Sequence, residues 1–172
     1  MWGNTVKIAV VEYKSITGEV CMSRIITFRF QWTDAWFRID EGYDSIIETS
    51  DGGSATIKFL VNSKPYDIVL TGREDEFICD LQLLNGWNKK CYENNYVFDG
   101  TMWNLLFIYD DVKVFAQGSN GFPKEFLEFL HLLHNKYQLP KADIEDERYI
   151  LAGIKRTEIR ELSESDLSAP YF

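Results

Sequence analysis

Two histidines stand three residues apart in the segment His-Leu-Leu-His, at His131 and His134. On a helix this spacing places both imidazole rings on neighbouring faces, where they can share a metal ion. Glu128, three residues before His131, offers a third ligand. A closed zinc site needs four ligands, and the surrounding sequence supplies no others at a recognisable spacing. We therefore interpret both histidines as residues at the edge of a helical core, and we expect no metal and no cofactor.

The sequence contains no arrangement typical of nucleophilic or phosphate chemistry. A nucleophilic Ser or Cys needs a neighbouring base, but both histidines lie on one predicted helix and no Gly-x-Ser-x-Gly segment is present. The segment 118–121, Gly-Ser-Asn-Gly, precedes a helix and offers amides to an anion. It contains no Lys, however, and Pro123 removes one amide. We therefore predict that the protein is not an enzyme. We interpret the corner at 118–123 as an ordinary strand-to-helix junction.

Aromatic side chains and acids gather in one segment that is rich in turn residues. Aromatic residues make up 15% of the chain, and residues 33–51 hold six acidic residues and one basic residue. Trp side chains often anchor protein interfaces, and carboxylates around them select a basic partner. The predicted partner-binding residues are Trp32, Asp34, Trp36, Asp40, Glu41 and Asp44. The alternative is that these rings cover the open end of a sheet.

Charge and composition exclude several classes of protein. The formal net charge of −9 argues against direct nucleic-acid binding, which needs Lys and Arg to replace counterions. No run of about 18 apolar residues is present, so we expect no membrane-spanning helix. The N-terminal segment lacks a long apolar stretch and a cleavage site, which favours a first strand in a cytoplasmic protein. Three widely spaced Cys residues without a Cys-x-x-Cys motif indicate reduced, mostly buried thiols.

The hydrophobic pattern predicts mostly strands in the first two thirds of the chain. Residues 5–13, 23–30, 54–61 and 66–70 are rich in β-branched and aromatic residues, and turn signals at 51–53 and 62–65 separate some of them. In residues 101–109 both alternating faces carry apolar groups, which is typical of a central strand. Asp110-Asp111 then turns the chain into a return strand over 112–120.

Two helices are predicted. Thr71-Gly72-Arg73-Glu74 fits a capping box, and the apolar residues that follow keep helical spacing, although Asn85-Gly86 indicates a break before Trp87. A second helix begins near Pro123 and runs to about Tyr137. Its apolar face is formed by Phe122, Phe126, Phe129, Leu130, Leu133 and Tyr137.

The order of these motifs is similar to that of a known group of domains. The motifs are Asp99-Gly100-x-x-Trp103-x-Leu105, then Tyr109-Asp110, then Gly118-Ser119-Asn120-x-Phe122-Pro123. Together they resemble a group of uncharacterised bacterial domains that is common in Firmicutes and their mobile elements. The resemblance covers residues 23–138, and it implies a fold without implying any catalytic residue.

Taken together, the sequence predicts an α+β fold: an antiparallel sheet of six to eight strands, two packed helices and a C-terminal helical appendage. We expect one domain over residues 1–140 and a helical, acidic tail over 141–172. The expected function is that of a non-catalytic acidic inhibitor or immunity-type protein that occupies a basic surface, such as that of a nuclease or toxin. The alternatives are a ligand-binding or enzymatic domain with a pocket between sheet and helix, and a structural subunit of a phage or secretion assembly.

Overall fold

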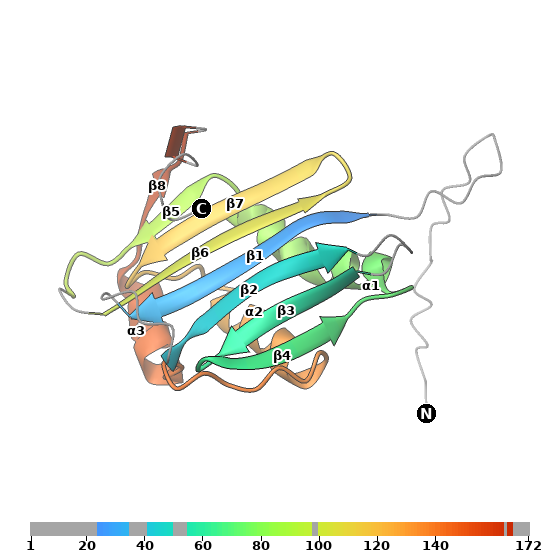
Figure 1. The fold of residues 1–172 in the computed structure, drawn as a ribbon. Helices are drawn as coiled ribbons and strands as arrows, with labels where there is room; N and C mark the ends of the chain where they lie inside the picture. The colour runs from blue at the N-terminus through green and yellow to red at the C-terminus, as the bar shows by residue number, and fades with distance from the viewer. Residues whose placement is uncertain (1–23, 35–40, 50–54, 98–99, 164, 167–172) are drawn as a thin grey trace, which may run out of the picture.

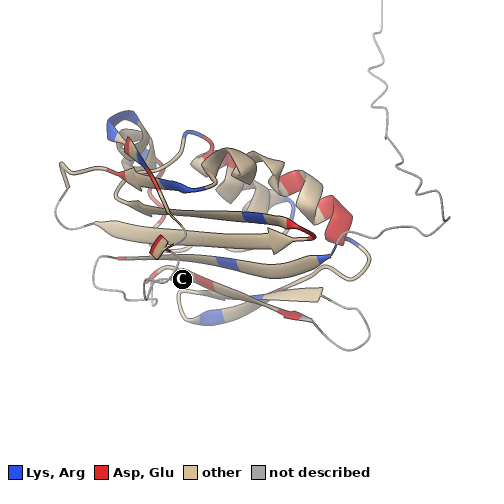
Figure 2. Ribbon diagram, turned by 90° about the horizontal axis from the view of Figure 1, so that it is seen from above, with Lys and Arg blue, Asp and Glu red and all other residues tan. Residues whose placement is uncertain are grey.

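The computed structural model describes residues 24–34, 41–49, 55–97, 100–163 and 165–166. Within them an eight-stranded, mostly antiparallel sheet carries its helices on one face, which confirms the predicted α+β class (Figures 1 and 2). In chain order the elements are β1 (Ile25–Asp34), β2 (Tyr43–Thr49), β3 (Ala55–Val61), β4 (Lys64–Val69), α1 (Glu74–Asp80), the 3-10 helix η2 (Leu81–Trp87), β5 (Lys90–Glu93), β6 (Thr101–Tyr109), β7 (Val112–Ser119), α2 (Phe126–Asn135), α3 (Glu147–Arg156) and β8 (Glu158–Glu161).

The strands lie in the order β4-β3-β2-β1-β6-β7-β5-β8, and every neighbouring pair is antiparallel except β5 with β7. After β4 at one edge, α1 and η2 carry the chain behind the sheet to β5 near the other edge (Figure 1). The prediction that residues 101–109 form a central strand is confirmed, because β6 lies between β1 and β7.

Aromatic rings fill the layer between the sheet and the helices. The ring of Phe126 on α2 lies 5.3 Å from the ring of Trp103 on β6 and 5.4 Å from that of Trp32 on β1, measured between centroids. Trp87, at the end of η2, stacks on Phe126 at 5.8 Å. These large side chains are fully buried.

The first helical region differs from its prediction. The capping box is wrong: the N-cap of α1 is Arg73 without a side-chain hydrogen bond, and Glu74 instead accepts the backbone N–H of Ile25 at 3.0 Å. The α-helix ends at Asp80 and continues as η2, well before Asn85-Gly86. The buried residues of η2 are Leu81, Leu84 and Trp87. Their spacing of three matches the three residues per turn of a 3-10 helix, which brings all three onto the core.

The second helix follows its predicted pattern. All six residues of the predicted apolar face are buried, although α2 itself begins at Phe126. The helix starts after Pro123 because residues 124 and 125 form a turn, in which the Phe126 N–H donates to the Pro123 carbonyl at 3.0 Å. None of the described helices is long and apolar enough to cross a membrane.

The segment after Pro140 is packed against the rest of the chain. Asp146 caps α3 by accepting the backbone N–H groups of Arg148 and Tyr149, and Ile150 on this helix belongs to the main core. The following residues form β8, which pairs with β5 at the edge of the sheet. We expected a tail here and no strand. All four residues of β8 are exposed, so backbone pairing with β5 holds this strand in place. The side chains show no alternation of buried and exposed residues from which the strand could be predicted.

The sheet surface that faces away from the helices is called the open face below (Figure 2). Because side chains alternate along a strand, it carries every second residue of each strand. Its residues on β4, β3 and β2 include Pro65, Asp67, Val69, Thr56, Lys58, Leu60, Asp44, Ile46 and Glu48. Those on β1, β6, β7, β5 and β8 include Thr27, Arg29, Gln31, Thr33, Met102, Asn104, Leu106, Ile108, Lys113, Phe115, Gln117, Ser119, Cys91, Glu93 and Arg160.

Candidate functional site

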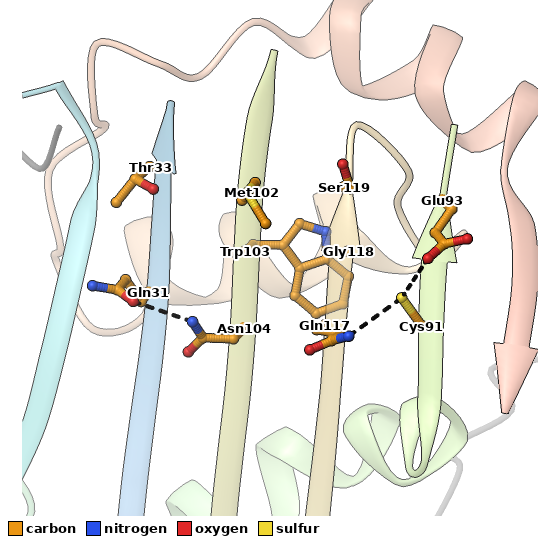
Figure 3. Close-up of a pocket in the computed structure, with 10 residues that line it drawn as sticks. All are labelled: Gln31, Thr33, Cys91, Glu93, Met102, Trp103, Asn104, Gln117, Gly118 and Ser119. Carbon is orange, nitrogen blue, oxygen red and sulfur yellow. Dashed lines mark hydrogen bonds between the residues drawn. The ribbon is translucent and has the colours of Figure 1, made fainter. Parts of the chain in front are cut away.

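A polar pocket of about 160 Å³ lies on the open face, over the centre of the sheet (Figure 3). Strand register builds it as two rows of side chains across β1, β6, β7 and β5. The first row is Gln31, Asn104, Gln117 and Cys91, and the second is Thr33, Met102, Ser119 and Glu93. Neighbours in a row are direct strand partners, so β1 and the strands within residues 90–119 together supply one set of hydrogen-bonding groups.

Hydrogen bonds link the members of the first row. The Asn104 Nδ2 donates to Gln31 Oε1 at 3.1 Å, and the Gln117 Nε2 donates to Cys91 Sγ at 3.5 Å. The Cys91 thiol in turn faces Glu93 Oε1 at 3.4 Å. Asn104 is only 7% exposed, yet its Oδ1 has no hydrogen-bond partner among the described residues. The pocket is therefore lined by a residue that has a buried, unpaired polar atom.

The charge in the pocket comes from one carboxylate. Among the lining residues, Glu93 is the acid, and no Lys, Arg or His is present. Arg160 on β8 lies outside the lining, with its Nε 3.8 Å from Glu93 Oε1. Burial raises the pKa of the Cys91 thiol, so this sulfur stays protonated near neutral pH. A protonated thiol is a poor nucleophile, and the arrangement is suited to binding rather than to covalent chemistry.

The Gly-Ser-Asn-Gly corner supports the pocket from the helix side of the sheet. A Cβ atom on Gly118 would lie 2.2 Å from Trp103 Nε1, so only glycine leaves room for the indole beneath the strand. The Trp103 Nε1–H donates to the Gly121 carbonyl at 2.9 Å. Asn120, with a φ of 55°, accepts the Thr101 N–H and the Tyr149 hydroxyl through Oδ1, each at 2.7 Å. The corner thus joins β6, β7 and α3.

The second histidine belongs to a buried polar group at the start of the C-terminal segment. His134 Nδ1 lies 2.7 Å from the Leu139 carbonyl, which can only accept, so this nitrogen carries a proton. His134 Nε2 lies 2.9 Å from Glu145 Oε2, and the Tyr43 hydroxyl donates to Glu145 Oε1. Burial raises the pKa of Glu145 to about 7 and lowers the pKa of His134. Below about pH 7 the pair shares one proton and carries no net charge.

The two histidines do not form a shared metal site. Both ring nitrogens of His134 are engaged by Leu139 and Glu145, while the His131 Nε2 faces Glu147 at 3.4 Å. In the described part of the chain no group of three His, Cys, Asp or Glu side chains is placed to hold a metal ion. Of the two described cysteines, which are both free thiols, Cys91 is buried and Cys79 is exposed.

The predicted partner-binding residues do not form one patch. Trp32 is 0% exposed and packs in the core, because it shares the helix-facing side of β1 with Phe28 and Phe30. It is therefore not a surface anchor, and the alternative of a ring covering the sheet describes it better. Trp36 and Asp40 lie outside the described residues.

The three described acids of that prediction lie in different places. Asp34 is half-buried at the end of β1, and Glu41 is exposed, with its carbonyl accepting the Ile144 N–H at 2.9 Å. Asp44 lies on the open face beside Ile46, which is 62% exposed. Asp44 is thus the predicted residue that the fold places on the same surface as the polar pocket.

Sequence reasoning missed the pocket. The available signal was a carboxamide side chain within each of three strands that also carry large apolar residues, at Gln31, Asn104 and Gln117. In a central strand such residues must face either a polar core or an open surface. Without the strand order, nothing in the sequence shows that they meet.

Comparisons with protein-family models, curated proteins and solved structures gave no match for this chain. The resemblance to uncharacterised bacterial domains stays a prediction.

Proposed function

We propose that this protein is a non-catalytic, acidic binding protein of the inhibitor or immunity type, and that it holds a basic surface of a protein partner against its open face. The observation that carries the proposal is on β2. There Ile46, an apolar side chain 62% exposed, stands between Asp44 and Glu48 on a sheet surface that no described helix covers. Exposed apolar groups with acids beside them suit an interface with a basic protein.

The neighbouring strands extend this surface. Val69 on the edge strand β4 is 57% exposed, and a hollow on the open face is lined by Leu60, Pro65 and Asp67 together with Asp44. Four of the described basic residues lie on the same surface, namely Arg29, Lys58, Lys113 and Arg160. Lys58 is bound to Glu48 at 2.7 Å. The net charge of −9 supplies a long-range attraction for a basic partner and accelerates encounter.

A matched pair of charge reversals tests the proposal. Asp44→Lys changes the open face, and Glu128→Lys makes the same change of charge on the exposed side of α2, on the opposite side of the molecule. The wild-type protein is used to capture its partner from its native host, and binding rates to the purified partner are then measured at two salt concentrations. We expect Asp44→Lys to slow association by about tenfold at low salt, and less at high salt, because complementary charge mainly steers encounter.

Glu128→Lys is expected to leave the association rate within about twofold of the wild type, since distant exposed charges are largely screened. Equal rates for both variants would place the interface on another surface. Turnover of a substrate by the isolated protein would replace the inhibitor function with an enzymatic one. Extended self-association in solution would favour a structural subunit.

A further inference from the structure

The buried acceptor in the polar pocket indicates what the pocket binds. Asn104 is buried on the central strand β6, and its Oδ1 lacks a partner within the described residues. Leaving such an atom unpaired costs free energy that a ligand with an N–H group recovers. Asn104 Nδ2 donates to Gln31, and turning both carboxamides would let Gln31 donate to Asn104 Oδ1 but leave Nδ2 unpaired, so either orientation leaves one buried polar atom of Asn104 without a partner.

The other groups around the cavity also favour a donor. Ser119 and Thr33 contribute hydroxyl groups, and Glu93 contributes a carboxylate on the next strand but one. The Thr33 hydroxyl donates to the Asp34 carbonyl at 3.1 Å, which leaves its lone pairs for accepting. A ligand with several N–H groups and a positive charge therefore complements both the acceptors and the carboxylate.

Size and shape favour a guanidinium group. The cavity of about 160 Å³ is close to the volume of about 150 Å³ that is known to hold a benzene ring, so it accepts a planar group of that size. A guanidinium presents five N–H donors in a fixed plane, so it can donate hydrogen bonds to acceptors on neighbouring strands at the same time. Met102 lines the same cavity and offers an apolar wall for the methylene groups that precede the guanidinium.

We propose that the pocket binds the guanidinium of one arginine side chain, donated by the basic partner. This inference rests on the proposed function for the source of the arginine, but not for the chemistry of the pocket. The site lies on the same open face as Asp44, and its first strand, β1, adjoins β2, so a partner seated on that face reaches it. Arg160, 3.8 Å from Glu93, acts as an internal competitor for the carboxylate.

The chemistry is tested with the whole protein and N-acetylarginine amide as the probe, by calorimetry and by NMR of the side-chain amide groups. N-acetylcitrulline amide, which has the same shape without the charge, is the matched ligand. We expect saturable binding of the arginine probe that shifts the Asn104 amide signals, and binding of the citrulline probe that is at least tenfold weaker.

Five variants assign the contacts. Asn104→Leu is expected to abolish binding, whereas Asn104→Asp, which keeps an acceptor and adds a charge, is expected to strengthen it several-fold. Glu93→Gln is expected to weaken binding several-fold, and Asp111→Asn, which removes one charge at the far end of the β6–β7 hairpin, is expected to leave it unchanged. Arg160→Gln is expected to strengthen binding, a gain that a merely structural role of Arg160 does not produce. Circular dichroism checks that each variant is folded.

The inference is overturned if the arginine probe does not shift the Asn104 signals, if citrulline binds equally well, or if Asn104→Leu retains the binding. The source of the arginine is tested separately, by capturing the partner in the presence of excess probe. Competition, and loss of capture in Asn104→Leu, support an arginine of the partner. If neither the probe nor Asn104→Leu reduces capture, the arginine does not come from the partner, and the ligand is a free arginine-like molecule. If the probe binds but Asp44→Lys captures the partner normally, the proposed interface fails and the pocket chemistry stands.

Discussion

The buried pair of His134 and Glu145 predicts a pH dependence that becomes visible only when one partner is removed. In an unfolded chain, Glu145 loses its proton near pH 4.5 and His134 near pH 6.5. In the folded protein the pKa of Glu145 is raised to about 7 and that of His134 is lowered, so the pair holds one proton throughout most of that interval. Folded and unfolded pairs then bind equal numbers of protons, and the pair contributes no slope to the stability.

His134→Asn leaves Glu145 alone in its buried position, where the side chain is only 6% exposed. Because the folded pKa of this acid is raised, its stabilising contribution is complete below about pH 4.5 and is lost as the pH rises through about 7. The shift from 4.5 to about 7, at about 1.4 kcal/mol for each pKa unit, corresponds to roughly 3.5 kcal/mol of unfolding free energy.

Glu145→Gln produces the opposite slope. The amide keeps the shape of the carboxyl group, accepts from Tyr43 and donates to the Nε2 of His134. The folded pKa of His134 remains lowered by burial, so its contribution is complete above about pH 6.5 and is lost as the pH falls through the lowered value. This variant is therefore expected to be most stable where His134→Asn is least stable.

The measurement is urea unfolding followed by tryptophan fluorescence, at several values from about pH 5 to about pH 8. Each variant is compared with the wild type at the same pH, which cancels the titration of groups elsewhere in the chain. We plot the unfolding free energy of each variant minus that of the wild type against pH, and we expect the two curves to have opposite slopes. His134→Asn is expected to lose roughly 2 to 3 kcal/mol of unfolding free energy as the pH rises across the range. Two flat or parallel curves would refute the shared proton and the raised pKa of Glu145.

Three further predictions concern the junction beneath the pocket. Trp103→Ala should lower the unfolding free energy by about 3–5 kcal/mol, because a buried ring on the central strand leaves a cavity; a melting temperature equal to that of the wild type would contradict its burial. Gly118→Ala should destabilise by about 1–3 kcal/mol, since the new methyl group meets the Trp103 indole. Gly86→Ala, where no atom lies within 4 Å of the new Cβ, is the matched control and should change stability far less. Asn120→Ala should cost about 2 kcal/mol by removing the acceptor of the buried Thr101 N–H, measured as a shift in urea midpoint.

Local patterns in the sequence determined much of the fold. The two apolar faces of residues 101–109 indicated a central strand, and the spacing of apolar residues in 122–137 indicated a helix with one buried face. The turn at Asn62 and Ser63 was also predictable, and both residues have positive φ values near 50–61°, which suit a tight hairpin. Each of these features depends on residues that are close in sequence, so their chemistry can be read without the tertiary structure.

Some local signals gave the wrong answer because a tertiary contact outweighed them. Thr71 and Glu74 fit a capping box, but Glu74 accepts the first N–H of β1 instead. Trp32 stands beside an acidic, turn-rich segment and was predicted as a surface anchor. Its place on the helix-facing side of β1 was set by the register of that strand, which brings it against Phe126.

The candidate site was decided by the tertiary structure alone. Gln31, Asn104, Gln117 and Cys91 come from four strands, and their meeting depends on the strand order and on a register that a shift of one residue would reverse. The sequence sets the alternation that gives each strand a polar side. Only the folded sheet decides which polar sides become neighbours, because strand pairing is made by backbone groups that are the same for almost every residue.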